Sequence, residues 1–326
     1  MNTHECVLLL GAGFTRNFGA PLAADLWALL FSHPDLRRHA PIHDLLRSQF
    51  DFETVYHEVM TGNFQLAERR AMEKAIQDTY DYVDSIVQGV GRNIHAPDIY
   101  RVQAFLNAFA GIRGRPGFIF SLNQDLFIER YFCNGTRPVL PHIPSGRDWF
   151  TSDGAYAAYL GMQALISDAL SPSLASIGPD SLYYVKLHGS SNWFSTAGTR
   201  QMVIGRAKEA QIGGDSLLSF YADLFRKVLV EGTRRVLCLG YSFRDDHINN
   251  VLADSVDSGV EIFILGPGSP QSKVENLKKL HRGADIWKGL AGYFPFDLHT
   301  LFPPDNRSTQ EWRFVSQQIF GRVVEP

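Results

Sequence analysis

The sequence predicts an α/β fold in which helices flank a parallel sheet and a helical insertion follows the first strand-and-helix unit. Two observations support this fold class. Short, continuous apolar runs such as Cys6–Leu10 recur along the chain, and such runs are typical of parallel strands that are buried on both faces. Each run also ends in glycine or a small polar residue, and ligands of open parallel sheets bind at that edge.

The first unit begins with the strand Cys6–Leu10, which a glycine-rich turn joins to a helix expected over residues 21–31. Apolar side chains recur along one side of this helix, at Leu22, Leu26, Leu29 and Leu30. Helical patterns then recur, for example over 64–87 and 99–109, with no convincing buried strand. We therefore expect one domain, 1–326. Its segments 1–31 and 117–326 form the core and a C-terminal tail helix, and 32–116 forms a helical insertion.

The remaining elements follow the same logic. A short helix is expected over 126–132, a longer one over 245–256, and a tail helix over 308–320 with Ser308 as its N-cap. A loop rich in proline and glycine is expected over 134–154. Four further apolar runs are candidate core strands, at residues 118–121, 182–187, 236–239 and 261–265.

Composition excludes several classes of protein. A formal net charge of -3 gives no electrostatic reason to expect nucleic acid as a direct ligand. The three cysteines, Cys6, Cys133 and Cys238, form no CxxC pair, which excludes a structural zinc site built on cysteines. Cys6 and Cys238 lie in apolar runs and are expected to be core residues. We expect no signal peptide, no membrane span and a cytoplasmic location.

The first candidate site is the turn Gly11-Ala12-Gly13-Phe14-Thr15, after the first strand. Its glycines allow a sharp turn and a close approach to a ligand, and the amides that follow are suited to a pyrophosphate. This arrangement opens a Rossmann-like nucleotide-binding unit. The dehydrogenase fingerprint GxGxxG is incomplete because Arg16 stands at the third glycine, so hydride transfer is disfavoured. The alternative is a tight turn without a ligand.

Two later strand ends carry candidate catalytic residues. Asn123 is suited to a ribose hydroxyl or a water, or else forms an Asx-turn. Asp125 either stabilises a developing positive charge or caps the next helix. His188, beside a glycine at a strand end, is placed as a general base, although a structural histidine is the commoner case.

The last candidate turns are Gly240-Tyr241-Ser242 and Gly266, which follow the last two strands. Gly240 and Ser242 are suited to a phosphate or ribose. Asp245 is expected to cap the next helix. The run Asp245-Asp246-His247 also suggests a metal, but neighbouring helical residues point in different directions and the sequence identifies no partner ligands. We therefore expect no metal. Neither a GxSxG nor a Walker A motif is present.

These segments, in this order, resemble the Sir2 (sirtuin) family. The opening turn resembles its GAGxS signature, Asn123 and Asp125 its NxD motif, and His188-Gly189 its catalytic HG. The resemblance implies that Asn123 binds the nicotinamide ribose and that His188 is the base, with NAD as substrate. It also implies cofactor contacts from the strand-end turns, at Gly11, Ala12, Gly13, Phe14, Thr15, Gly240, Ser242 and Gly266.

The chain departs from the deacylases of that family because it lacks their four zinc cysteines and their phenylalanine-arginine pair after the proline. It is more similar to bacterial Sir2-like proteins of antiphage defence. That branch implies hydrolysis of NAD+ to nicotinamide and ADP-ribose, a homo-oligomer, and a partner such as a HerA-type ATPase or an Argonaute. Two alternatives stay open: a module that senses NAD or ADP-ribose without turnover, and an NAD-dependent protein deacylase.

Overall fold

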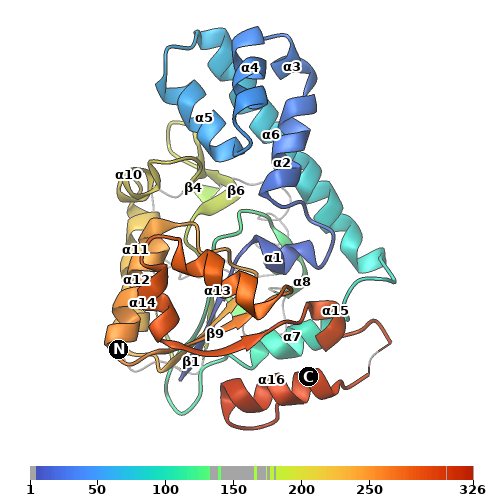
Figure 1. Cartoon of the computed structure of the whole chain (residues 1–326), viewed down its shortest axis with the longest axis vertical. Helices are drawn as coiled ribbons and strands as arrows, with labels where there is room; N and C mark the ends of the chain where they lie inside the picture. Colours follow the sequence, from blue (N-terminus) through green and yellow to red (C-terminus); the bar gives the residue numbers. More distant parts are fainter. Residues whose placement is uncertain are drawn as a thin grey trace.

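The structure is a computed structural model that describes residues 5–132, 139–140, 165–166, 174, 177–179, 181–305 and 307–325 (Figure 1). Cys133 lies outside these residues. So does most of the loop expected over 134–154. The described part of that loop, β3 (Val139–Leu140), is a short strand, which corrects the expectation of a loop throughout. None of the helices in the described ranges is long and apolar enough to cross a membrane.

The main sheet has seven strands in the order β10-β9-β8-β1-β2-β5-β3, and every neighbouring pair is parallel. The predicted α/β class is confirmed, and so are the five predicted core strands. β10, at one edge, was missed because alanine and glycine interrupt its short apolar run. The other strands are β1 (Cys6–Leu10), β2 (Gly117–Ser121), β5 (Leu182–Lys186), β8 (Arg235–Leu239), β9 (Glu261–Leu265) and β10 (Leu290–Phe294).

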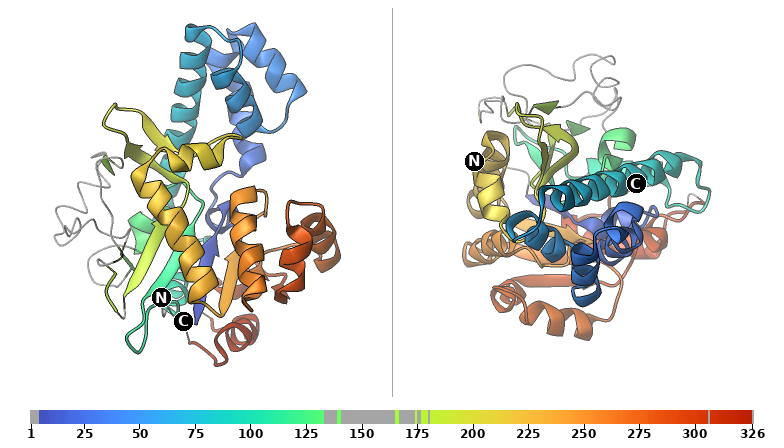
Figure 2. Two further views of the ribbon diagram at one scale, coloured as in Figure 1. Left: turned by 90° about the vertical axis from the view of Figure 1, so that its left-hand side faces the viewer. Right: turned by 90° about the horizontal axis from the view of Figure 1, so that it is seen from above.

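Alternate residues of β1, β2, β5, β8 and β9 pack in two separate hydrophobic cores, as the pleat of a strand requires. Val7 and Leu9 of β1 face the core that α11 (Ser216–Glu231) and α12 (Asp246–Asp257) cover. Leu8 and Leu10 face the opposite core, to which α7 (Ile99–Asn107), α8 (Phe127–Phe132) and α16 (Gln310–Phe320) contribute together with the end of α6 (Leu66–Gly89). Figure 2 gives two further views of this arrangement of helices about the sheet.

A third core lies within the helices at the top of Figure 1. It is built on residues such as Leu30, Leu46 and Met72, and Ile204 joins it from the second half of the chain. α7, in contrast, packs in the second core. The expected insertion boundaries at 32 and 116 stay a prediction. The helices of this third core are α2 (Ala23–Ser32), α3 (Pro34–Arg37), α4 (Ala40–Ser48), α5 (Phe52–Thr61) and α6 (Leu66–Gly89).

Short elements complete the fold. A second, three-stranded sheet has the order β4-β6-β7 and was not predicted. Its strands are β4 (Leu165–Ile166), β6 (Gly189–Phe194) and β7 (Arg200–Met202). The short helices are α1 (Ala12–Arg16), η1 (Val90–Arg92), α10 (Lys208–Gly213), α13 (Pro270–Lys278), α14 (Gly283–Lys288) and α15 (Leu298–Leu301).

Two predicted helix starts need correction. The helix expected from residue 21 begins at Ala23, and a separate helix, α1, fills part of the preceding turn. The N-cap of α16 is Thr309 and not Ser308. Its hydroxyl accepts a hydrogen bond from the Trp312 amide at 3.2 Å, which satisfies one of the free donors of the first helical turn.

The order of the strands decides where a ligand can bind. β1 lies at the centre, with β2 on one side and β8 on the other. The strands that follow β1 in the chain are therefore added on both of its sides, so the loops at the carboxyl ends of β2 and β8 diverge to either side of β1. Such a switch point opens a crevice at the carboxyl edge of a parallel sheet.

Candidate functional site

A cavity of about 1210 Å³ lies at this switch point, larger than the roughly 300–1,000 Å³ of ordinary small-molecule sites. Residues that follow five different strands line it. Gln124, Asp125 and the buried Phe14 and Thr15 are not among the lining residues. The predicted site residues that do line the cavity are Gly11, Ala12, Gly13, Asn123, His188, Gly240, Ser242 and Gly266.

The two glycine turns are packed against each other. A Cβ added to Gly13 would lie 2.6 Å from the Cα atom of Gly240, and one added to Gly11 would lie 2.6 Å from the Gly240 carbonyl oxygen. Gly240 also has a φ of +67°, a left-handed conformation that favours glycine. Glycine is thus required at all three positions by contact between the turns themselves.

The amides of the first turn are largely engaged in the same contact. Gly11 donates to the carbonyl of Leu239 and Gly13 to that of Gly240, each at 3.0 Å. Phe14 donates to the Gly11 carbonyl at 2.9 Å. These three amides already donate to protein carbonyls, so they are not free to hold a pyrophosphate as the sequence led us to expect.

Cationic side chains supply positive charge to the lining of the cavity. Lys273, in α13, lies with Nζ 3.3 Å from the carbonyl oxygen of Tyr241, and burial lowers its pKa. Arg206 and Arg244 also line the cavity. Arg244 lies in the run between Gly240 and His247 that the sequence singled out, although without a role, and neither Lys273 nor Arg206 belongs to such a motif. The signal that could have indicated Lys273 is its place in the helix that follows β9.

Asn123 fastens the end of β2 to the first glycine turn. Its Nδ2 donates to the Gly11 carbonyl at 3.1 Å and to Thr15 Oγ1 at 3.3 Å. Its backbone amide donates to the Ser121 hydroxyl oxygen at 3.1 Å. The side chain thus bonds across the chain and does not form a local Asx-turn. Its orientation in the cavity is fixed before any ligand binds.

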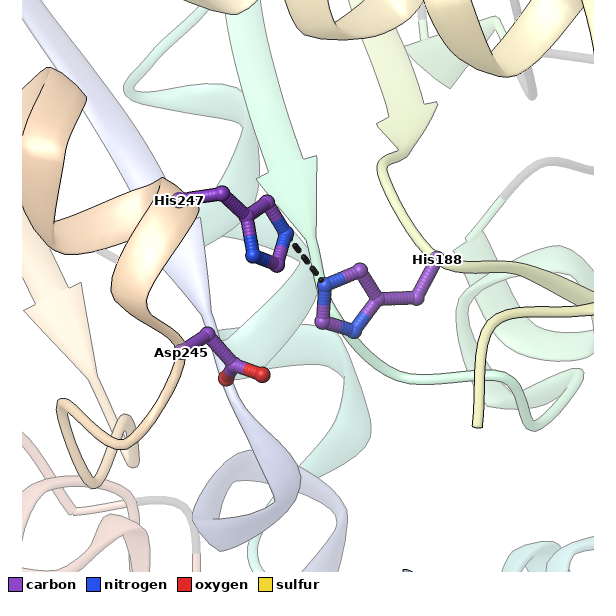
Figure 3. Close-up of side chains that lie close together, drawn as sticks. All are labelled: His188, Asp245 and His247. Atoms are coloured by element: carbon purple, nitrogen blue, oxygen red, sulfur yellow. Dashed lines mark hydrogen bonds between the residues drawn. The ribbon is translucent and has the colours of Figure 1, made fainter. Parts of the chain in front are cut away.

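His188 faces a second histidine. Its Nε2 lies 3.0 Å from Nε2 of His247, and the Asp245 carboxylate lies beside the pair, as Figure 3 shows. His188 is only 4% exposed, and burial lowers its pKa to about 3. Burial also lowers the pKa of His247. Both imidazoles are therefore uncharged at neutral pH, and one donates its proton to the lone pair of the other.

The role expected for Asp245 needs correction. It occupies the N-cap position of α12, but its side chain makes no capping hydrogen bond. Its carboxylate instead turns toward His188 and accepts from Lys208 Nζ at 2.6 Å. The partner that the sequence did not identify for Asp245 and His247 is therefore His188, which the fold brings from the end of β5.

Comparison with known proteins places this site in a family. A family model described as a SIR2-like domain matches residues 117–285, more than half of the chain. The chain belongs to the SIR2-like domain family. No curated protein matches it in sequence.

Two solved structures are similar to the SIR2-like chain. One is a mutant Sir2 homologue in complex with 2'-O-acetyl ADP-ribose, at 12% identity over 91% of this chain and 88% of that chain, with a TM-score of 0.44. The other is a complex of a Sir2 homologue with NAD, at 15% identity over 90% of this chain and 84% of that chain, with a TM-score of 0.39.

Asp125 of the SIR2-like chain has a structural contact of its own. Its Oδ1 accepts from the Phe127 amide at 2.9 Å, at the start of α8, which is the capping alternative weighed from the sequence. Burial raises the pKa of this carboxyl, although the Lys186 ammonium opposes the shift. A catalytic role for Asp125 stays a prediction, and its position outside the cavity lining requires that it act through a neighbour.

A buried ion pair lies next to the strand end that carries His188. The Nζ of Lys186 lies 2.8 Å from Glu129 Oε1, and both side chains are fully buried. The same ammonium donates to the Ser190 hydroxyl at 2.9 Å and to the Asp125 carbonyl at 2.5 Å. It thereby ties β5 and β6 to α8, on either side of His188.

Gln124 and Lys208 connect the helices of the third core to the site. Gln124 donates to the His188 carbonyl at 3.2 Å and accepts from the Tyr80 hydroxyl of α6. Lys208 bonds Glu53 of α5 at 2.7 Å as well as Asp245. Sequence reasoning missed both residues because these contacts join segments that lie far apart in the chain.

Proposed function

We propose that this SIR2-like chain is an NAD+ glycohydrolase that cleaves NAD+ to nicotinamide and ADP-ribose. One observation carries the proposal. Asn123 and His188, from the ends of neighbouring strands, line the same cavity as the glycine turns that follow β1 and β8. This combines a ribose-binding amide, an uncharged imidazole and a nucleotide-sized cavity at the switch point of a parallel sheet.

The cavity suggests an orientation for the dinucleotide. The adenosine half would lie near Gly240, Ser242 and Gly266, and the pyrophosphate near Ala12 and Lys273, where a cation faces the cavity. The nicotinamide ribose would then lie beside Asn123. Phe14 and Thr15 would act indirectly, Thr15 by holding the Asn123 amide.

The chemistry follows from those places. The bond between nicotinamide nitrogen and ribose carbon breaks with its electron pair leaving on nicotinamide, and positive charge builds on the sugar. Water adds to that carbon. His188 accepts the proton of the water or of a ribose hydroxyl, for which its imidazole must be uncharged, as its lowered pKa ensures. The nearby Asp245 carboxylate favours the imidazolium that forms.

In the cell, we propose that the hydrolysis depletes cytoplasmic NAD as an antiphage response. An activity of this kind must be silent in uninfected cells, which favours a homo-oligomer under the control of a partner, such as a HerA-type ATPase or an Argonaute. The test is the NAD content of phage-infected cells that carry wild type or His188→Ala. Depletion by wild type alone supports the role, and equal NAD in both strains refutes it.

The activity itself is tested with the purified chain and NAD+, with nicotinamide and ADP-ribose followed by chromatography. Wild type should release nicotinamide without an acyl peptide, and Asn123→Ala and His188→Ala should release none. The same assay is run with candidate partners added. If no nicotinamide is released while NAD or ADP-ribose still binds, the chain is a sensor. That alternative is favoured by one contact, since His188 Nε2 faces His247 and is not directed freely into the cavity.

A further inference from the structure

The pair of histidines and the neighbouring carboxylate have the composition of a metal site. One ligand atom from each of His188, Asp245 and His247 lies within 4.8 Å of the other two. The three side chains converge from the end of β5 and from the start of α12 (Figure 3). Nitrogen and carboxylate ligands together suit zinc and the neighbouring divalent transition metals.

The spacing of the two nitrogens fits a shared ion. Zinc–nitrogen bonds of about 2.0–2.1 Å place two ligand nitrogens about 3.3 Å apart at a tetrahedral angle. The observed separation of the two Nε2 atoms is 3.0 Å, so movement by a few tenths of an ångström accommodates the ion. Binding replaces one hydrogen bond between neutral imidazoles with two metal bonds. The ring that donated this hydrogen bond moves its proton from Nε2 to Nδ1, so that each ring then offers its Nε2 lone pair.

Asp245 can complete the set without releasing its present partner. Lys208 contacts only Oδ1, which leaves the second carboxylate oxygen to the ion. Lys208 is held in turn by Glu53, so the carboxylate is oriented by a second layer of contacts, as ligating carboxylates commonly are. The Tyr241 hydroxyl also accepts from the Asp245 amide at 3.3 Å and fixes the backbone there.

All three side chains line the large cavity, so the remaining coordination position faces the space that the substrate would use. Three protein ligands with one open position are the pattern of an accessible zinc site, whereas structural sites are closed by four. The ion would therefore meet small molecules in the cavity as well as the protein.

We propose that His188, Asp245 and His247 bind one divalent transition-metal ion of the zinc class. The bound ion takes Nε2 of His188 and so withholds the base from the cavity. The second half of this inference rests on the proposed hydrolysis, whereas the binding of the ion does not.

Binding is tested with the untagged full chain by competition for Zn²⁺ against a chromophoric chelator, and with Co²⁺ by visible absorption. Wild type should bind one ion per chain. His188→Gln, His247→Gln and Asp245→Asn should each weaken binding at least tenfold and remove the Co²⁺ spectrum. His281→Gln is the matched control, because this exposed histidine contacts Asn250 and lies outside the cluster. Circular dichroism melting confirms that every variant is folded.

These measurements decide whether the cluster binds the ion. Loss of binding in the three cluster variants but not in His281→Gln supports the site. Undiminished binding in the cluster variants, or none in wild type, overturns it. Nicotinamide release is then measured with added Zn²⁺ and again after a chelator is added. Inhibition by Zn²⁺ that the chelator reverses supports the proposal that the ion withholds His188, and full activity with the site occupied refutes it. Zinc binding by a chain that cleaves no NAD even after the chelator has removed the metal keeps the site and rejects the hydrolase.

Discussion

The Lys208 ammonium lies 2.6 Å from Asp245 Oδ1, and the same nitrogen lies 2.7 Å from Glu53 Oε2. One cation thus joins a helix of the third core to the N-terminus of α12, at the wall of the cavity. Burial alone would lower the pKa of Lys208, but the two carboxylates raise it above its usual value. Burial would raise the pKa of Asp245, but His188 and the same Lys208 ammonium hold it below its usual value.

Lys208→Met should therefore destabilise the chain, because it leaves two carboxylates without their cation. The group is mostly but not fully buried, so the loss in the free energy of unfolding should be about 1–3 kcal/mol, below that of a fully buried pair. Urea denaturation at pH 7 measures it. Lys74→Met is the control, because its contact with Asp78 is exposed and its loss should cost much less. Equal effects of the two variants would contradict the prediction.

The buried pair of Lys186 and Glu129 predicts a larger effect. Glu129 Oε2 has no hydrogen-bond partner among the described residues, so Lys186 is the main compensation for that charge. Lys186→Met should cost about 3–5 kcal/mol of unfolding free energy. The double variant with Glu129→Gln should recover part of the loss, since the isolated charge is then gone. A double variant no more stable than the single one would refute this account.

The glycine turns allow packing and ligand contact to be separated. Gly240→Ala should cost about 2 kcal/mol or more, because its φ is +67° and a Cβ would lie 2.4 Å from the Phe14 amide nitrogen. Gly266→Ala should leave stability nearly unchanged, because a Cβ there meets open space. Since Gly266 lines the cavity, that variant should still weaken NAD binding under the proposed function. Thermal melting and isothermal titration measure the two effects.

The two described cysteines should be inert to thiol reagents. Both are buried core residues, as the sequence predicted, and burial raises the pKa of Cys238 to about 12 and that of Cys6 further. At pH 8 only about one part in ten thousand of Cys238 is then thiolate, the reactive form. Peptide mass spectrometry after iodoacetamide treatment should find both unmodified, with labelling that rises with pH and on unfolding. Rapid labelling of the folded chain at pH 8 would contradict this.

The strands were predictable because each is a short apolar run that ends in a turn residue, and burial on both faces requires such runs. β10 was missed because it is an edge strand with a glycine at 292 and needs less apolar character. Ser308 and Thr309 are both good N-cap residues, so the sequence-based choice of Ser308 missed the true cap by one residue.

The sequence predicted the site residues that follow the strands, but it did not predict the contacts between residues far apart in the chain. Asn123 and His188 follow strands whose carboxyl ends meet at one edge, a consequence of parallel topology. The approach of His247 to His188, and of Lys208 to Asp245, depends on how α10 and α12 pack, which no local pattern encodes. These contacts required the folded structure.

The length of α6 has a mechanical consequence. Its 24 residues form a rod of about 36 Å, with Met72 in the third core and Val87 in the core beneath the sheet. Between these anchors, Tyr80 contacts Gln124, whose amide holds the carbonyl of His188. A rotation of α6 caused by a force on its outer end would therefore be transmitted through Tyr80 and Gln124 to the backbone of His188.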